Sequence, residues 1–343
     1  MRPHQLPRKL APFAAVLTYA VLIVWASICL FPLYWVAVTS LQSVDDSTRG
    51  PLYLPFVDFR PTLAAWAEIL FYASEQLLSR YFNSTVIAVG STLLTLLIGA
   101  MAVYGLTRFR YAVPAIAIGL GSFGVAFAAV AFAYPVIGRS FFLPALAIMV
   151  LLLLTARFLP RGPALRNEGI YINILFTRLL PPVSTVIPIY FMAMYTGTLD
   201  TRFALTFVNT AANLPLAVWL LRPVFGEVAT EQEEAARLDG ASHFRIFFGV
   251  LLPMVAGAIV AVGFFVFVLC WNEYLFAVYL TGEHAMTLPP WLAGQMSVRE
   301  AAVGGDQEER LNLSAAIILT VLPLVALTGF AQRFLSRLAS WGR

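Results

Sequence analysis

Five polar side chains fall within, or at the edges of, long apolar segments of the chain: Arg178, Asn209, Asn213, Asn272 and Glu273. Such groups are costly inside a bilayer and usually face a cavity or a partner there. They could therefore line a path for a polar solute and offer it hydrogen bonds. They could also be structural, because Arg178 could bind backbone carbonyls and Glu273 could pair with Arg178 or with a second chain.

Four aromatic side chains near the same segments could stack on the flat face of a solute ring: Tyr190, Trp219, Trp271 and Tyr274. Trp and Tyr are also enriched at membrane–water interfaces, where they anchor spans. Packing or anchoring is therefore the plainer interpretation of all four.

The sequence has no grouping typical of catalysis or metal binding. His4, His243 and His284 fall in three different expected loops, so neither a metal cluster nor a catalytic triad is indicated. Cys29 and Cys270 are isolated in apolar segments, and no phosphate-binding Walker A pattern is present. We expect no catalytic residue, no metal, no cofactor and no ATP hydrolysis by this chain.

The composition indicates a polytopic membrane protein. Hydrophobic residues make up 60% of the chain and charged residues 12%, whereas soluble domains carry roughly 25% charged residues. The net charge of +4 does not indicate nucleic acid, because the basic residues are scattered at the ends of apolar segments. The basic N-terminus is followed by an apolar run over 10–41, too long for a signal peptide, which predicts a retained first span.

The apolar segments predict an all-α transmembrane bundle of about eight spans, since a span needs about 20 apolar residues. The expected spans are 12–41, 84–106, 112–137, 141–159, 173–196, 203–221, 250–280 and 311–332. Only Gly138, Arg139 and Ser140 join the third and fourth, so this pair forms a tight hairpin. A re-entrant or interfacial hairpin is the alternative for that pair.

Lys and Arg are distributed unequally between the two sides of this bundle. The side holding both termini and 230–249 carries twice as many of them as the other side. Because cytoplasmic loops are enriched in Lys and Arg, both termini and 230–249 are expected in the cytoplasm. The long loops 42–83 and 281–310 then lie outside, where they could form short surface helices.

The stretch 230–253 is highly polar and lies between two strongly apolar segments. Thr230 with Glu233 fits a capping box that begins a helix. Gly240 fits the left-handed position that ends it, and Ser242 can begin a second short helix. Pro253 is tolerated if it falls in the first turn of the next span. The pattern predicts a helix–turn–helix that projects from the membrane, although an ordinary loop is the alternative.

The same stretch resembles the EAA loop of ABC importer permeases. That pattern is Glu-Ala-Ala, three residues, Gly, nine residues and Ile-x-Leu-Pro, and the single departure is Val250 in place of Ile. In that family the loop is the coupling helix, which lies in a groove of the cytoplasmic ATPase. The resemblance assigns this role to Glu234, Ala235, Ala236, Asp239, Gly240, Leu252 and Pro253.

Other segments resemble the carbohydrate-uptake branch of the family, in particular the smaller maltose-type permease subunit. The segments 104–110, 178–190, 213–221 and 271–277 are each similar to a span end or core span of sugar permeases. The resemblance implies one permease domain over 1–343. It also implies that Arg178, Tyr190, Asn209, Asn213, Trp271, Asn272 and Glu273 could contact a sugar.

Residues 111–172 depart from the family pattern. The family has six spans and passes almost directly from Arg110 to the 173–196 span. An inserted two-span hairpin preserves the side on which 230–249 lies, in agreement with the distribution of basic residues. Packing against lipid or a partner permease is the plainest interpretation of the insertion.

The resemblance also implies a set of partners in a bacterial inner membrane. They are a second homologous permease, a cytoplasmic ABC ATPase dimer, an extracytoplasmic solute-binding protein, a carbohydrate and membrane lipid. The sequence leaves open an importer of another small polar solute, an ion-coupled secondary transporter and a membrane enzyme such as a glycosyltransferase. An ion-coupled transporter predicts acidic residues deep in several spans, and only Glu273 approaches that pattern.

Overall fold

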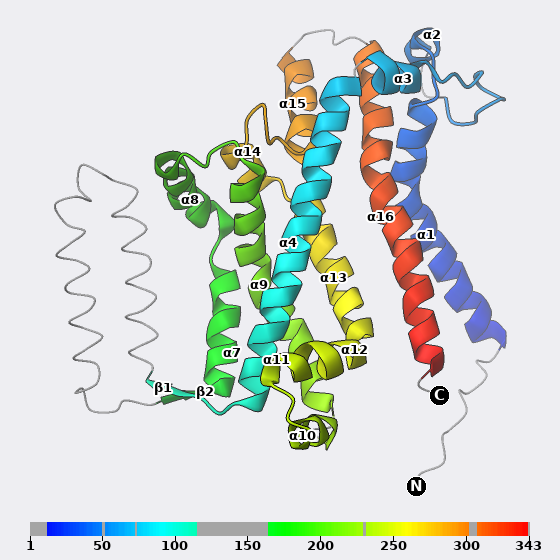
Figure 1. Ribbon diagram of the computed structural model, residues 1–343. Coiled ribbons are helices and arrows are strands. Elements are labelled where there is room, and N and C mark those ends of the chain that lie inside the picture. The colour runs from blue at the N-terminus through cyan, green and yellow to red at the C-terminus, as the bar shows by residue number, and fades with distance from the viewer. Residues whose placement is uncertain are drawn as a thin grey trace. The chain divides into compact units, whose positions relative to one another are not determined.

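The computed structural model describes residues 12–49, 52–72, 74–114, 164–228, 231–301 and 307–341. These residues are predominantly helical, in agreement with the expected all-α class (Figure 1). The departure is a short antiparallel pair, β1 (Ala112–Pro114) with β2 (Ala164–Arg166). The expected spans 112–137 and 141–159, apart from residues 112–114, lie outside the described residues.

Four helices of the described part are long and apolar enough to cross a membrane, and two bent helix pairs raise the number to six if each pair is one span. The four are α1 (Pro12–Thr39), α4 (Ser74–Arg108), α9 (Arg202–Glu227) and α16 (Gln307–Trp341). Each of the four matches an expected span. They support a polytopic helical protein, whereas the total of eight remains a prediction.

The first bent pair replaces the straight span expected over 173–196. It consists of α7 (Asn167–Phe176) continued by the 3₁₀ turn η2 (Thr177–Leu179), and then α8 (Pro182–Thr196), at an angle of 86°. Leu180 and Pro181 have ψ values of 127° and leave the helical region. A residue before proline avoids the helical conformation, so the Pro181–Pro182 pair explains the break.

The second bent pair replaces the first part of the span expected over 250–280. Here α11 (His243–Ile246), the π-helical turn η3 (Phe247–Leu251) and α12 (Leu252–Met254) meet α13 (Ala256–Trp271) at 81°. Helix α13 ends at Trp271, and a separate helix, α14 (Leu275–Leu280), follows it. The apolar run predicted one helix because its hydrophobicity continues across the break at residues 272–274.

The described chain divides into two compact units. The first comprises the described parts of Met1–Leu77 and Leu292–Pro323, and the second those of Leu78–Trp291 and Leu324–Arg343. In the first unit, short helices α2 (Val44–Thr48) and α3 (Ala64–Ala67) and the π-helical turn η1 (Glu68–Tyr72) fall in the loop expected outside. They confirm the short helices expected there. Helix α15 (Leu288–Ala301) begins in the second unit.

In the second unit, α4 packs closely along α9 and α13. A Cβ atom added at Gly99 would lie 3.5 Å from Cβ of Ala217 on α9, and one at Gly263 would lie 2.9 Å from Leu96 on α4. Ser91 of α4 also donates a hydrogen bond to the Thr206 carbonyl of α9 at 3.1 Å. Small residues let helix backbones approach closely where no water-driven effect holds them together. These contacts fix α9 in the position from which it lines the site.

The link from α8 to α9 is held by a carboxylate. Asp200 accepts backbone hydrogen bonds from Gly282 at 2.7 Å, His284 at 3.0 Å and Ala285 at 2.8 Å. Burial alone would raise the pKa of Asp200, but these three N–H groups hold the pKa below its usual value. The loop after α14 is therefore attached to the loop before α9.

Candidate functional site

The segment that resembles the EAA loop folds as a helix–turn–helix. Helix α10 spans Glu231–Leu238, and Gly240, whose φ is +79°, terminates it two residues later. The N–H of Ala241 bonds to the Ala236 carbonyl at 2.9 Å and that of Gly240 to Arg237 at 3.0 Å, as in a Schellman motif. The helix end expected at Gly240 is confirmed, whereas Thr230 of the expected capping box lies outside the described residues.

The second short helix also begins at the expected residue. Ser242 accepts a hydrogen bond from the N–H of Arg245 at 3.4 Å and so caps α11. The helical path continues through η3 into α12, where Pro253 lies in the first turn as expected. Figure 1 shows α11 close to the start of α13, next to α12, with α10 below them.

A buried ion pair joins this segment to α4. The Arg108 guanidinium contacts the Glu233 carboxylate at 2.6 Å, and its side chain also donates to the Val228 carbonyl at 3.3 Å. The side chains of Arg108 and Glu233 are 10% and 2% exposed. The Tyr104 hydroxyl of α4 lies 3.3 Å from Nδ1 of His243. The end of α4 is therefore attached to both short helices.

The sequence did not single out this pairing. Glu233 was assigned to the capping box, and Arg108 was counted only as a basic residue at a span end. Helical spacing contains a usable signal, because Glu233 and Glu234 cannot share one face of α10. The structure buries Glu233 against Arg108 and leaves Glu234 exposed.

The outer face of the segment carries large exposed apolar side chains. Leu238 is 91% exposed and Phe244 is 66% exposed. Glu234 and Ala235 are also exposed, and Ala236 is half-buried. Neighbouring exposed apolar side chains favour an interaction surface. Leu238 and Phe244 were not among the residues expected to take part in coupling.

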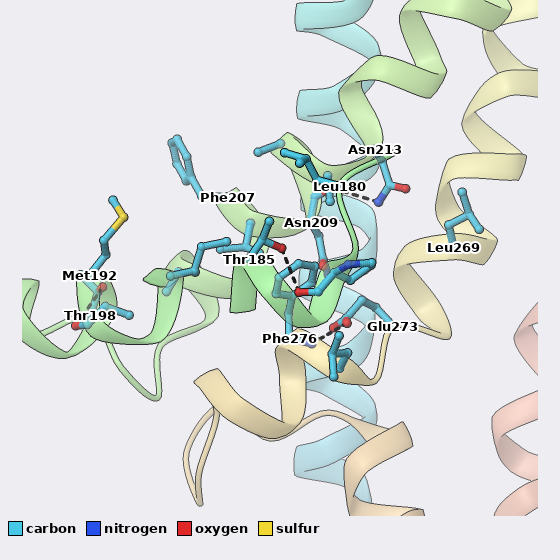
Figure 2. Close-up of a pocket in the computed structure, with 18 of the residues that line it drawn as sticks. Leu180, Thr185, Met192, Thr198, Phe207, Asn209, Asn213, Leu269, Glu273 and Phe276 are labelled. Atoms are coloured by element: carbon cyan, nitrogen blue, oxygen red, sulfur yellow. Dashed lines mark hydrogen bonds between the residues drawn. The ribbon is translucent and has the colours of Figure 1, made fainter. Parts of the chain in front are cut away.

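A second feature is a cavity of about 940 Å³ lined by residues from η2, α8, α9, the end of α13 and the start of α14 (Figure 2). Its wall is mainly apolar, with few polar side chains. Four of the expected polar residues line it: Arg178, Asn209, Asn213 and Glu273. The breaks at Pro181–Pro182 and at residues 272–274 both border this cavity. Discontinuous helices commonly form the substrate sites of transporters.

Arg178 is held by α9 at the edge of the cavity. Its guanidinium donates to the Ala212 carbonyl at 2.7 Å and to Oδ1 of Asn213 at 3.3 Å. The amide nitrogen of Asn213 in turn donates to the Asn209 carbonyl at 2.9 Å. Arg178 therefore binds a carbonyl, as its structural interpretation predicted.

Glu273 caps the helix that follows it. Its carboxylate accepts the N–H groups of Phe276 at 2.7 Å and Ala277 at 3.0 Å, at the start of α14, where the helix dipole favours a negative charge. The pairing of Glu273 with Arg178 that the sequence left open is not found in the described part of the chain. Figure 2 shows the Glu273 carboxylate beside Phe276.

Asn209 has a different environment. Its side chain is buried, with 1% exposure, and neither amide atom has a hydrogen-bond partner among the described residues. Burying an unpaired polar group destabilises a protein by about 1–3 kcal/mol. Because Asn209 lines the cavity, a bound solute could supply the missing hydrogen bonds.

The other three expected residues do not line this cavity. Trp271 is buried and packs against Tyr81 and Phe267, and Asn272 donates to the Val268 carbonyl at the end of α13. Tyr190 packs against an apolar cluster of α8, α9 and α14. Packing, the plainer interpretation, describes Trp271 and Tyr190.

Sequence reasoning missed several polar or aromatic residues of the cavity wall. Thr185, Thr177 and Thr198 contribute hydroxyls, and Phe203 and Phe207 contribute rings. Phe203 and Phe207 are four residues apart and share a face of α9, but no sequence signal connected that face with Asn209. The described residues contain no group of three or more His, Cys, Asp or Glu side chains that could hold a metal ion.

The helical bundle, its broken spans and its projecting helix–turn–helix define a class of multi-pass transport protein. A family model described as the inner membrane component of binding-protein-dependent transport systems matches residues 132–340. The chain belongs to this family and is a permease subunit of an ABC importer. Such subunits are not catalytic, and separate ATPase subunits hydrolyse ATP. The family assignment replaces the secondary transporter and the membrane enzyme that the sequence left open.

Several relatives match nearly the whole chain. A probable ABC transporter permease of Sinorhizobium fredii, y4oR, is 28% identical over 91% of this chain and 89% of its own. The diacetylchitobiose uptake permease NgcG of Streptomyces coelicolor is 26% identical over 96% and 88%. The trehalose/maltose permease MalG of Thermococcus litoralis is 25% identical over 98% and 96%.

A solved structure shares the fold. A chain of a bacterial ABC transporter that imports the acidic polysaccharide alginate superposes with a TM-score of 0.66 at 18% identity. The match covers 96% of this chain and 99% of that chain.

Proposed function

We propose that this permease carries a carbohydrate across a bacterial inner membrane, and that the cavity between α8, α9 and α14 contributes to the path. The observation that supports it most directly is the convergence of Arg178, Asn209, Asn213 and Glu273 on a mainly apolar wall. Small-molecule sites combine such walls with a few placed polar groups. Sugars present apolar ring faces and many hydroxyls, and they suit both parts of this wall.

The relatives support the same solute class. The printed functions of NgcG and MalG concern diacetylchitobiose and trehalose or maltose. Within the proposal, 1–343 forms one permease domain in which 111–172 is an insertion and 230–249 is the cytoplasmic coupling loop. Both termini lie in the cytoplasm, and eight spans cross the membrane.

The proposed assembly contains a second homologous permease, two copies of a cytoplasmic ATPase and an extracytoplasmic solute-binding protein. The coupling surface consists of Glu234, Ala235, Ala236, Asp239 and Gly240, with Leu252 and Pro253 at its base. Leu238 and Phe244 extend this surface, because both are strongly exposed. Closure of the ATPases would draw paired coupling loops together, and the Arg108–Glu233 pair would pass that movement to α4.

The test is substrate stimulation of the reconstituted complex in proteoliposomes. Disaccharides and oligosaccharides, each added with the solute-binding protein, should raise the ATPase activity of the complex. They should also be taken up into the proteoliposomes. Amino acids, short peptides and polyamines serve as controls for other small polar solutes. Stimulation by one of these controls and by no sugar would overturn the carbohydrate assignment while leaving the family assignment intact.

A further inference from the structure

A second cavity, of about 730 Å³, lies away from the proposed solute path. It is lined by the end of α4, the start of α7 and the last turns of α9. Its wall combines apolar, aromatic and charged side chains, among them Arg108, Glu168, Tyr171, Trp219, Leu220 and Arg222. The proposed function uses Arg108 alone of these residues.

Opposite charges stand side by side in this cavity. Arg222 forms an ion pair with Glu168, and its guanidinium lies 4.3 Å from the ring centre of Tyr171. The side chain of Arg222 is 35% exposed and that of Glu168 is 71% exposed. Exposed ion pairs are weak. A ligand that carries both charges can therefore bind Arg222 through its anionic group and Glu168 through its cationic group. The other cation of the wall, Arg108, is already neutralised by Glu233.

The Tyr171 hydroxyl points to an additional ligand. Tyr171 is 7% exposed, lines the cavity, and its hydroxyl has no hydrogen-bond partner among the described residues. Buried hydroxyl groups nearly always have a partner. A ligand oxygen beside Arg222 would lie near this hydroxyl, because the guanidinium stands over the Tyr171 ring.

The cavity lies at the ends of two candidate spans. Both Gln76–Arg108 and Arg202–Glu227 have the length and hydropathy of a membrane-crossing helix, and the cavity is formed by their last turns. Trp219 is 53% exposed on its wall, and Trp is enriched at membrane interfaces. Basic pockets between span ends bind the headgroups of anionic lipids, whereas this cavity offers a cation and an anion together.

We propose that this cavity binds the headgroup of a zwitterionic aminophospholipid, a phosphoethanolamine. The phosphate bonds to Arg222 and to the Tyr171 hydroxyl, and the ammonium group donates hydrogen bonds to Glu168. Trp219 and Leu220 contact the glycerol and the first part of the acyl chains. The net charge of the Arg222–Glu168 pair is zero, which matches this headgroup better than a singly anionic one.

Occupancy would bear on the coupling loop. Arg108 lines the cavity and also holds Glu233 of α10. A headgroup in the cavity shields this ion pair from water, and desolvation strengthens electrostatic interactions. The lipid would therefore stiffen the attachment of α10 to α4.

The test is lipid retention measured by native mass spectrometry on the tagged chain, purified in detergent with the subunits that accompany it. The complex is mixed with phosphatidylethanolamine, phosphatidylcholine or phosphatidylglycerol that carry identical acyl chains. Choline has no N–H donor for Glu168, so we expect phosphatidylethanolamine to be retained about tenfold more strongly than phosphatidylcholine. Water-soluble phosphoethanolamine, added as a competitor, tests whether a free headgroup is sufficient.

Variants separate the contributions of the two charges. Glu168→Gln should make retention of the ethanolamine and choline lipids equal, and Arg222→Gln should weaken retention of both. Tyr171→Phe should weaken retention without changing the preference. Glu227→Gln and Arg110→Gln are matched controls, because each removes one exposed charge near the same helix ends but outside the cavity.

Three outcomes would overturn the proposal. They are equal retention of all three lipids by the unmodified chain, a preference for phosphatidylglycerol, and an ethanolamine preference that survives Glu168→Gln. Competition by free phosphoethanolamine at the concentration of the lipid would show that a soluble ligand, and not the lipid, occupies the cavity. The preference between two lipids is measured on one protein preparation, so partial loss of stability in Glu168→Gln does not imitate a lost preference.

Discussion

At the scale of single residues, the unpaired side chain of Asn209 is expected to lower the stability of the protein and to serve transport. A residue kept for stability would have its polar atoms paired or would be apolar. Asn209 is buried with both amide atoms unpaired in the described part of the chain. A solute that pairs with this amide would recover the free energy that burial of the unpaired group costs.

Asn209→Leu should therefore stabilise the protein while reducing transport. Leu is similar to Asn in length and branching, and it removes the unpaired amide. We expect the thermal midpoint in detergent to rise by roughly 2–4 °C and solute-stimulated ATPase activity to fall at least about tenfold. Both measurements use the same preparation, and Thr210→Val, at a buried polar position of α9 that does not line the cavity, is the control. A fall in midpoint together with unchanged transport would contradict this role.

For Asp200 we expect a role in stability and not in transport. Its contribution to stability should depend on pH. Its pKa is lowered in the folded protein, so its contribution to stability is present above the pKa of unfolded Asp and is lost as pH falls through the lower folded pKa. Asp200→Asn should lower the thermal midpoint by a roughly constant amount from about pH 8 to 5, and the difference should shrink below about pH 4. A difference between the two proteins that grows on acidification would contradict the hydrogen-bond assignment.

At the scale of elements, the turn between α10 and α11 depends on one backbone conformation. Gly240 has a φ of +79°, and nothing lies within 4 Å of a Cβ atom added there. A substitution is therefore opposed by backbone strain and not by a steric clash. Proline cannot adopt a positive φ, because its ring fixes φ near −65°.

Gly240→Pro should uncouple ATP hydrolysis from transport without unfolding the spans. Span stability comes from helices whose backbone bonds are internally satisfied, whereas the turn lies between two short helices. Co-purification of the ATPase and solute uptake should both fall, while the midpoint of the spans stays within roughly 2 °C. Gly249→Ala is the matched control, since it has a free Cβ position and no positive φ. Normal uptake by Gly240→Pro would show that 230–249 is an ordinary loop without a coupling role.

The Arg108–Glu233 pair can be tested at the same scale by a double-mutant cycle. Removing one partner of a buried pair leaves an uncompensated charge and destabilises by about 3–5 kcal/mol. Glu233→Leu and Arg108→Leu should each release α10, measured as faster proteolysis within 231–238, and the double change should restore part of the protection. Glu234→Leu, one residue away and exposed, should change proteolysis little. Additive effects of the two single changes would show that the residues act independently.

At the scale of the whole molecule, orientation decides which solvent each surface meets. The distribution of Lys and Arg predicts that α10 and α11 lie in the cytoplasm and that Ser47 and Gln307 lie on the opposite side of the membrane. Cysteines introduced at Ser47 and Gln307, after replacement of Cys29 and Cys270, should react with an impermeant reagent in intact cells. A cysteine at Ser242 should react only after permeabilisation. Labelling of Ser242 from outside would overturn the proposed topology.

The sequence predicted local structure better than tertiary contacts. The cap at Ser242 and the left-handed Gly240 follow from intrinsic preferences, so they could be read directly. The breaks at Pro181–Pro182 and 272–274 were missed because hydropathy measures apolar content and not the direction of a helix. The Arg108–Glu233 pair joins residues far apart in the sequence. Helical spacing separates the faces of Glu233 and Glu234, but it does not identify Arg108 as the partner. Arg178, Asn209, Asn213 and Glu273 were found as polar exceptions in apolar runs, but their convergence required the fold.

The pairing of β1 with β2 brings two positions that are far apart in the sequence close together. Ala112 is the partner of Arg166, so these two positions lie only about 5 Å apart. Asn167 reinforces this junction, since its amide binds the Leu106 and Phe109 carbonyls and the Tyr111 N–H. The entropy of closing a loop rises slowly with length. Because the two ends are held together, the segment between them can change in length at little cost in stability, and a reporter domain inserted there should leave the coupling loop undisturbed.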